Sequence, residues 1–272
     1  MIIFAPAKIN LGLNVLFKRP DGFHELDTCM LPIPLFDVLE ILLSDHFEFY
    51  QTGLEVPGTS EDNLCIKAYK LLKHEFDLPP VYMHLRKEIP MGAGLGGGSS
   101  DASHILKGLN ELFNLGLSIE ELEKRSAELG SDCPIFIQNK AQMAQGRGEI
   151  LKPCSIDLRD FWIKLINPGI HVGTREAYAG IVFSENNKSV QAIVEGPMEN
   201  WRSELKNDFE ISVFVVHPEL AAIKSDLYKE GALYAAMSGS GSTVFGLFRD
   251  EPQSTAYEAG YSTYIRKFQT TV

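Results

Sequence analysis

The sequence predicts an α+β protein built from two domains. Apolar and polar residues alternate with a period of two near the start of the chain, which indicates strands. Later segments carry apolar residues at helical spacing, which indicates helices. Strands and helices do not strictly alternate along the chain, and this order is typical of the α+β class. A chain of 272 residues without an internal repeat also favours two domains, at roughly 150 residues each. The polar stretch 154–160 places the expected domains at 1–155 and 156–272.

The first expected elements are strands. In residues 8–17, Ile9 and Leu11 begin an apolar face, while Lys8 and Asn10 begin a polar one, which predicts a strand with one buried face. Pro20 and Gly22 suit a hairpin turn directly after it. The strands expected to follow lie at 23–31, near 38–43 and near 47–51.

Capping residues mark the helices of the middle region. Asn63 is the expected N-cap of a helix that ends before Pro79, and Ser118 with Glu121 forms the capping box of another. Between them, a strand at 81–88 leads into a glycine-rich loop and then a helix expected to begin near Ser99 or Ser100.

The rest of the chain alternates hairpins and helices. The elements expected there are a hairpin at 141–153, a strand at 161–167, helices within 175–224, paired strands on either side of 238–242, a short helix near Thr255 and a final strand.

Composition narrows the classes of partner. The net charge of −11 disfavours binding to duplex DNA or RNA, although backbone N–H groups at a helix start still bind small anions. The four cysteines form no CxxC pair and the histidines no HExxH motif, so no zinc site is expected. The most apolar stretch, 30–43, is interrupted by prolines and acidic residues. A cytoplasmic protein with reduced thiols and no membrane span is therefore expected.

The glycines of segment 92–98 are the strongest chemical signal in the chain. So many glycines indicate special backbone geometry that lets a ligand approach closely, and the following helix start favours nucleotide phosphates. The segment matches GxGxxG, but it follows antiparallel signals and does not lie in a first βα turn, so a Rossmann site is discounted. No Gly-Lys-Ser/Thr, HRD or DFG sequence is present, which excludes a P-loop and a protein kinase.

Three motifs in order resemble the GHMP kinases, a superfamily of small-metabolite kinases, along the whole chain. They are the sequences Pro-Ala-Lys-Ile-Asn-Leu at 6–11, Ile-Pro-Met-Gly-Ala-Gly-Leu-Gly at 89–96 and Met-Ser-Gly-Ser-Gly-Ser at 237–242. The resemblance implies a two-domain fold with an N-terminal α/β domain and a C-terminal ferredoxin-like α+β domain.

Additional sequences narrow the resemblance to one branch. Gly-Gly-Gly-Ser-Ser-Asp-Ala at 96–102, Gly-Phe-His at 22–24 and Gly-Ser-Asp-Cys-Pro at 130–134 are similar to the kinases that phosphorylate the 2-hydroxyl of CDP-linked methylerythritol in non-mevalonate isoprenoid synthesis. Two alternatives stay open: a homoserine or mevalonate type of GHMP kinase, and a nucleotide-binding regulator without catalysis.

The resemblance also implies roles for individual residues. Lys8 and Asp132 would be catalytic; the alternatives are a solvated edge lysine and a turn cap. Phe23 departs from the usual tyrosine, and Gly173-Thr174 departs from the pattern that places Tyr178. The residues implied to bind ATP are Pro90, Gly92, Gly94, Leu95, Gly96, Gly97, Gly98, Ser99 and Ser100, and those implied to bind the cytidine substrate are Asn10, Phe23, His24, Tyr178, Gly239 and Ser240.

Partners and cofactors follow from the same resemblance. ATP would be the phosphate donor and Mg²⁺ its counterion, with no protein side chain assigned as a metal ligand. A monomer or a weak homodimer is expected.

Overall fold

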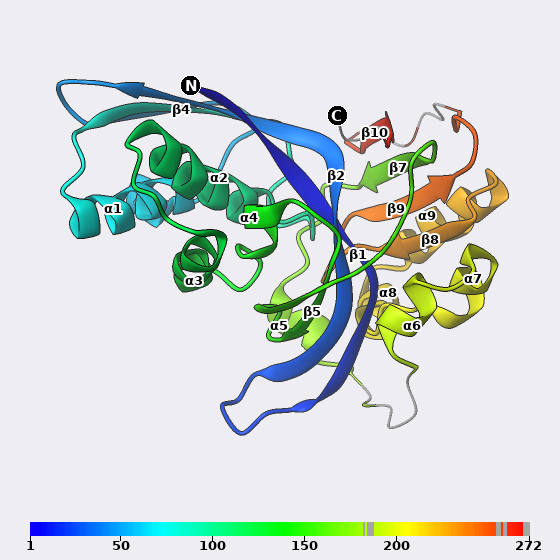
Figure 1. Cartoon of the computed structure of the whole chain (residues 1–272). Helices are drawn as coiled ribbons and strands as arrows, with labels where there is room; N and C mark the ends of the chain where they lie inside the picture. The colour runs from blue at the N-terminus through cyan, green and yellow to red at the C-terminus, as the bar shows by residue number, and fades with distance from the viewer. Residues whose placement is uncertain (182, 184–187, 254–256, 258–259, 269–272) are drawn as a thin grey trace. The chain divides into compact units, whose positions relative to one another are not determined.

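The computed structural model describes residues 1–181, 183, 188–253, 257 and 260–268 (Figure 1). These residues form two compact units. The first unit comprises Met1–Ala7, Leu35–Met91 and Gly96–Lys140, and the second comprises Lys8–Pro34, Gly92–Leu95 and the chain from Ala141 onward. Two long strands, β1 (Ile2–Lys18) and β2 (His24–Leu43), therefore contribute to both units. The single domain boundary at 155–156 stays a prediction.

The first unit contains a mixed sheet. The end of β2 pairs antiparallel with β4 (Val81–Lys87), and β3 (Glu48–Gly53) pairs parallel with β4. Successive residues of β4 alternate between buried and more exposed, as the period of two predicts.

Helices pack against this sheet around one apolar core. They are η1 (Ser60–Asp62), α1 (Leu64–Phe76), α2 (Gly97–Leu112), α3 (Ile119–Leu129) and α4 (Ile135–Gln138). Both predicted caps are confirmed: Asn63 accepts a hydrogen bond from the Cys65 amide at 2.9 Å, and Ser118 and Glu121 form the capping box. The core joins residues such as Leu72, Met83 and Ile105.

The second unit has a hairpin and a separate antiparallel sheet. The first half of β2 pairs with β5 (Gln142–Gly146), which pairs with β6 (Ile150–Pro153). The separate sheet has the ferredoxin-like order β10-β7-β9-β8. Its strands are β7 (Trp162–Asn167), β8 (Tyr234–Met237), β9 (Val244–Phe248) and β10 (Ser262–Lys267).

This unit has its own apolar core and also contains helices. They are α5 (Thr174–Tyr178), α6 (Val190–Val194), η2 (Met198–Asn200), α7 (Trp201–Glu204), α8 (Phe209–Val216) and α9 (Pro218–Lys229). Val213 and Leu220 of α8 and α9 lie in one cluster with Phe248 of β9. The helix expected near Thr255 lies outside the described residues. Within the described part of the chain, no helix is long and apolar enough to span a bilayer.

Three sequence predictions about these elements are wrong. β1 is buried on both faces from Ala5 to Val15, because its polar side chains find partners inside the protein. β2 is one continuous strand: Pro32 and Pro34 lie between the residues paired with β5 and those paired with β4, so their missing N–H groups cost no hydrogen bond to either of these two strands. The helix expected near Ser99 begins two residues earlier, at Gly97.

Candidate active site

The glycine-rich loop ends at an uncapped helix N-terminus. Gly92, Gly94 and Gly96 have φ angles of 61°, 77° and 67°, a left-handed conformation that side chains disfavour. Gly97 and Gly98 then adopt helical geometry, which explains the early start of α2. An α-helix leaves its first N–H groups without partners inside the helix, and Gly96 has no side chain to cap them. The loop therefore presents a partial positive charge suited to an anion.

All three sequence motifs meet in the second unit. The Ser238 hydroxyl donates a hydrogen bond to the Gly94 carbonyl at 2.8 Å and accepts one from the backbone N–H of Asn10 at 3.3 Å. The Lys8 amide donates to the Leu95 carbonyl at 2.9 Å. A Cβ on Gly94 would lie 1.9 Å from the Ser238 carbonyl oxygen, so this position requires glycine. Segments that are far apart in sequence thus hold one another in a fixed geometry.

Lys8 lies inside this junction. Only 3% of its surface is exposed, which excludes a solvated edge lysine. Its ammonium group donates to Asn10 Oδ1 at 2.7 Å, and Asn10 Nδ2 donates to Thr28 Oγ1 at 3.0 Å. The Thr28 hydroxyl in turn donates to the Gly12 carbonyl at 2.5 Å. A buried cation is thus oriented by a chain of fully partnered polar groups.

Sequence reasoning missed Asn207, which supports the third motif. Its side-chain amide donates to the carbonyls of Met237 and Gly239, both at 2.8 Å. Gly239 has a φ of 56°, and Ser240 after it is half-buried. A single asparagine in an irregular segment gives no sequence pattern, so only the folded chain reveals this contact.

Asp132 lies in the first unit, in the turn before α4. The Ser103 hydroxyl of α2 donates to the carbonyl of Cys133 at 2.8 Å, which ties this turn to the glycine-loop helix. Asp132 itself is half-buried. Because Lys8 belongs to the second unit, the pairing of the two residues stays a prediction.

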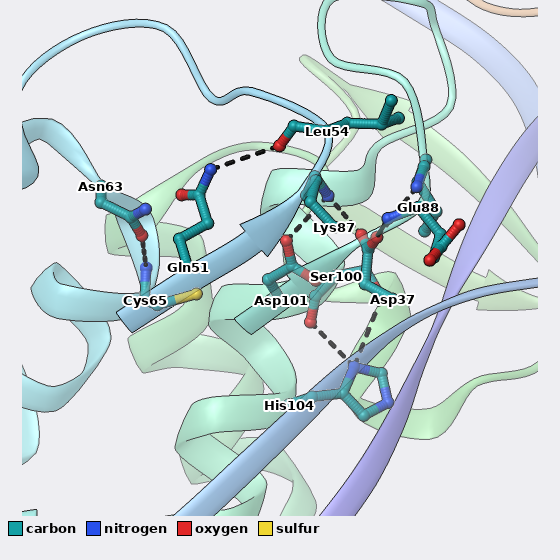
Figure 2. A network of polar contacts seen from close by, with 11 residues as sticks. Asp37, Gln51, Leu54, Asn63, Cys65, Lys87, Glu88, Ser100, Asp101 and His104 are labelled. Atoms are coloured by element: carbon teal, nitrogen blue, oxygen red, sulfur yellow. Dashed lines mark hydrogen bonds and ion pairs between the residues drawn. The ribbon is translucent and has the colours of Figure 1, made fainter. Parts of the chain in front are cut away.

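A buried charge network fixes the chain just before the glycine-rich loop (Figure 2). The Lys87 ammonium lies between the carboxylates of Asp37 and Asp101, 2.9 Å from Asp101 Oδ2. Asp37 also accepts from the amides of Glu88 and Ile89, at 2.6 and 2.9 Å. The network therefore anchors the end of β4, from which the loop emerges.

The charges of this network reflect burial and pairing. Burial alone would lower the pKa of Lys87, but Asp101 and Asp37 outweigh it and raise that pKa. Burial raises the pKa of Asp101 to about 8, against the opposing effect of Lys87. Asp101 Oδ1 has no hydrogen-bond partner among the described residues.

Asp101 also lines a cavity beside the first turn of α2. No sequence pattern predicts this cavity, because most of its lining is apolar. The lining residues all belong to the first unit: Val56, Pro57, Asp62, Asn63, Leu64, Cys65, Leu85, Met91, Gly98 and Asp101. A mostly apolar pocket with a few polar groups beside an anion site is typical of a nucleotide site.

Aromatic side chains gather at the hairpin between β1 and β2, and their role in cytidine binding stays a prediction. The rings of His24 and Tyr178 stack, with their centroids 4.3 Å apart and an angle of 19° between their planes. The ring centroid of Phe183 lies 6.0 Å from that of His24. Burial, together with Lys18, lowers the pKa of His24 and favours the neutral imidazole. Phe23 is 52% exposed, with the Arg147 guanidinium 4.8 Å from its ring centroid.

Acidic, histidine and cysteine side chains are spread over the described part of the chain. Among the residues that it describes, no three His, Cys, Asp or Glu side chains gather closely enough to hold a metal ion. Ser99, half-buried in the first turn of α2, is the hydroxyl nearest the helix start.

Two family models match the chain. "GHMP kinases N terminal domain" matches residues 63–140, and "GHMP kinases C terminal" matches residues 189–266. Curated relatives named 4-diphosphocytidyl-2-C-methyl-D-erythritol kinase match nearly the whole chain. The one from Cytophaga hutchinsonii is 51% identical and covers 93% of this chain and 94% of its own. The one from Bacteroides fragilis is 50% identical and covers 96% and 97%.

Solved structures agree with these matches. A 4-(cytidine 5'-diphospho)-2C-methyl-D-erythritol kinase superposes with a TM-score of 0.79 at 34% identity, covering 91% of this chain and 90% of that one. A mevalonate kinase from Methanococcus jannaschii has a TM-score of 0.71 at 13% identity, covering 99% and 98%, and so shares the fold alone. The chain has the α+β GHMP kinase fold and belongs to the 4-diphosphocytidyl-2-C-methyl-D-erythritol kinase family of that superfamily.

Proposed function

We propose that this protein transfers the γ-phosphoryl group of ATP to the 2-hydroxyl of 4-diphosphocytidyl-2-C-methyl-D-erythritol. The products are the 2-phosphate and ADP, within non-mevalonate isoprenoid synthesis. The observation that carries the proposal is the junction of Asn10, Gly94 and Ser238, which joins the three kinase motifs around a buried lysine. The names of the curated relatives support the choice of substrate.

ATP binding is assigned to the glycine-rich loop and the neighbouring cavity. The phosphates would accept hydrogen bonds from the first N–H groups of α2, where the helix dipole favours negative charge. The base would enter the cavity, where Leu64 and Met91 offer apolar contacts and Asn63 lies at the N-cap of α1. Asp101, whose Oδ1 has no hydrogen-bond partner among the described residues, also lines this cavity.

Catalysis is assigned to Asp132 and Lys8. As the substrate oxygen bonds to the γ-phosphorus and the bond to ADP breaks, Asp132 would accept or orient the proton of the attacking hydroxyl. The Lys8 ammonium would stabilise the negative charge on the transferring phosphoryl group. Asn10 holds that ammonium at 2.7 Å, which reduces the reorganisation needed during the reaction.

Mg²⁺ would neutralise charge on the phosphates of ATP. Protein sites for this ion commonly use substrate phosphates and water with one or two protein oxygens, which fits a chain whose described residues lack a three-residue cluster. Ser99, in the first turn of α2, would supply the protein oxygen.

The cytosine is assigned to the hairpin between β1 and β2. Phe23 is 52% exposed, and a base would stack on its ring. His24 would read the base edge, because a neutral imidazole carries one donor and one acceptor. Tyr178 already stacks on His24, so it would orient the imidazole and not contact the base through that face. That the protein is cytoplasmic, and that it is a monomer or a weak homodimer, stays a prediction.

The test is ATP consumption by the purified chain with CDP-methylerythritol, mevalonate, homoserine and galactose as acceptors. Turnover on the cytidine compound alone is expected, with Asp132→Asn as the control for contaminating kinases. Turnover only on another acceptor would move the protein to a sister activity. A wild-type chain that binds ATP but phosphorylates none of them would point to the regulator alternative.

A further inference from the structure

Two cysteines distant in sequence meet in the second unit. Cys29 lies on β2 and Cys154 directly follows β6, and their Sγ atoms are 3.8 Å apart. The strand register explains the meeting. Met30 of β2 pairs with Gln142 of β5, and Gln142 pairs with Pro153 of β6. Cys154 follows Pro153, so it leaves the sheet close to the level of Met30 and its neighbour Cys29.

The two thiols differ in access to solvent. Cys29 is completely buried, whereas Cys154 is partly exposed. The Cys29 thiol donates a hydrogen bond to Cys154 Sγ. This bond and burial raise the pKa of Cys29. The same bond lowers the pKa of Cys154. Glu195 is the carboxylate that faces Cys154; it also accepts from the Ser155 amide at 3.0 Å. Cys154 is therefore the thiol that an external reagent reaches and that supplies a thiolate.

We propose that Cys29 and Cys154 form a reversible dithiol–disulfide site that exchanges with low-molecular-weight disulfides. The Cys154 thiolate attacks one sulfur of the disulfide RSSR, forms a mixed disulfide and releases RS⁻. The Cys29 sulfur then attacks Cys154 Sγ, which releases the second RS⁻, and that group takes up the Cys29 proton. Two protein thiols are oxidised and one RSSR is reduced to two RSH.

The geometry makes closure a small movement. A disulfide bond is about 2.05 Å long, so the sulfur atoms must approach by roughly 1.8 Å. Cys29 is held within a paired strand, whereas Cys154 lies in an irregular segment. Most of the movement therefore falls on residues 154–155 and on the Glu195 contact, not on the sheet.

The site lies one residue from the Lys8 network. Thr28, next to Cys29 on the opposite face of β2, accepts from Asn10 and so helps to position Lys8. Disulfide formation itself does not depend on the proposed function.

The experiment incubates the full chain with reduced and oxidised glutathione at several ratios, blocks the remaining thiols and maps the peptides by mass spectrometry. The expected product is a 29–154 disulfide that dithiothreitol reverses. Cys29→Ser should stop at one glutathione on Cys154, and Cys154→Ser should form neither product. Cys65→Ser, a buried thiol in the other unit, is the matched control and should behave as wild type.

The mapping also defines the refuting results. The proposal is wrong if wild type retains glutathione on Cys154, or keeps both thiols free, under conditions that fully glutathionylate Cys29→Ser. It is equally wrong if Cys154 reacts in neither protein. Unfolding temperatures of the serine variants within about 2 °C of wild type would show that the products reflect thiol chemistry and not unfolding.

Discussion

Gly94→Ala tests the junction of the three motifs most directly. The new Cβ would lie 1.9 Å from the Ser238 carbonyl oxygen, whereas real contacts of this kind essentially never fall below 3.0 Å. The loop or Ser238 must therefore move by about 1 Å, and both are backbone. The φ of 77° adds roughly 1 to 2 kcal/mol for a residue with a side chain. Loss of the Ser238 hydrogen bond adds about 1 kcal/mol.

The expected total is a loss of about 2 to 3 kcal/mol in the free energy of unfolding, which lowers the Tm by roughly 4 to 5 °C. The measurement is thermal unfolding together with the KM for ATP, which should rise at least about tenfold. Gly98→Ala is the matched control from the same loop. Its Cβ would meet only ordinary contacts, at 3.7 Å from Met91 and 3.8 Å from Leu64, so its Tm should stay the same or rise.

Two results would refute this reasoning. A Tm of Gly94→Ala equal to that of wild type would show that the loop does not contact Ser238 in solution. Equal destabilisation by Gly98→Ala would show that the loop tolerates no added methyl group anywhere, so that the Ser238 contact has no special role.

Three further predictions concern chemistry and charge. Asp132→Asn should lower kcat by a factor of roughly 10² to 10⁴ while both substrates still bind. Lys8→Met should lower kcat by a comparable factor. Near-normal turnover of Asp132→Asn would show that the Asp132 carboxylate has only a structural role. Phe23→Ala should weaken binding of the cytidine substrate by about 1 to 3 kcal/mol in calorimetry, with ATP binding kept; equal weakening of both would indicate a damaged fold. The pKa of Asp101, about 8 when folded and near 4 when unfolded, means that the folded state holds an extra proton. The free energy of unfolding should therefore fall as pH rises from about 4 to 8, and Asp101→Asn should flatten that fall in denaturant titrations; an unchanged slope would contradict the assignment.

The sequence predicted those parts of the site that depend on local backbone demands. Left-handed φ angles require glycine, so the loop at 92–98 was visible as a pattern, as were the caps Asn63 and Ser118. Contacts between distant segments leave no such pattern. Asn207 looks like any polar loop residue until the carbonyls that it binds are in place.

Burial was the other quantity that local patterns could not supply. Lys8 and Asn10 on alternate positions of β1 indicate a solvated face when only one strand is considered. Their burial depends on Thr28 and Ser238, which supply the hydrogen bonds. Lys87 was likewise indistinguishable from an exposed strand lysine without Asp37 and Asp101.

The passage of β1 through both units has a consequence for synthesis on the ribosome. Asn10 and its partner Ser238 are 228 residues apart, so at roughly 5 to 20 residues per second the strand waits about 10 to 45 s for that contact. The first unit is complete once residue 140 has emerged, whereas the second waits for the strands around its C-terminal motif. During that interval residues 8–18 of β1 are without the part of their native surroundings that the C-terminal segments supply.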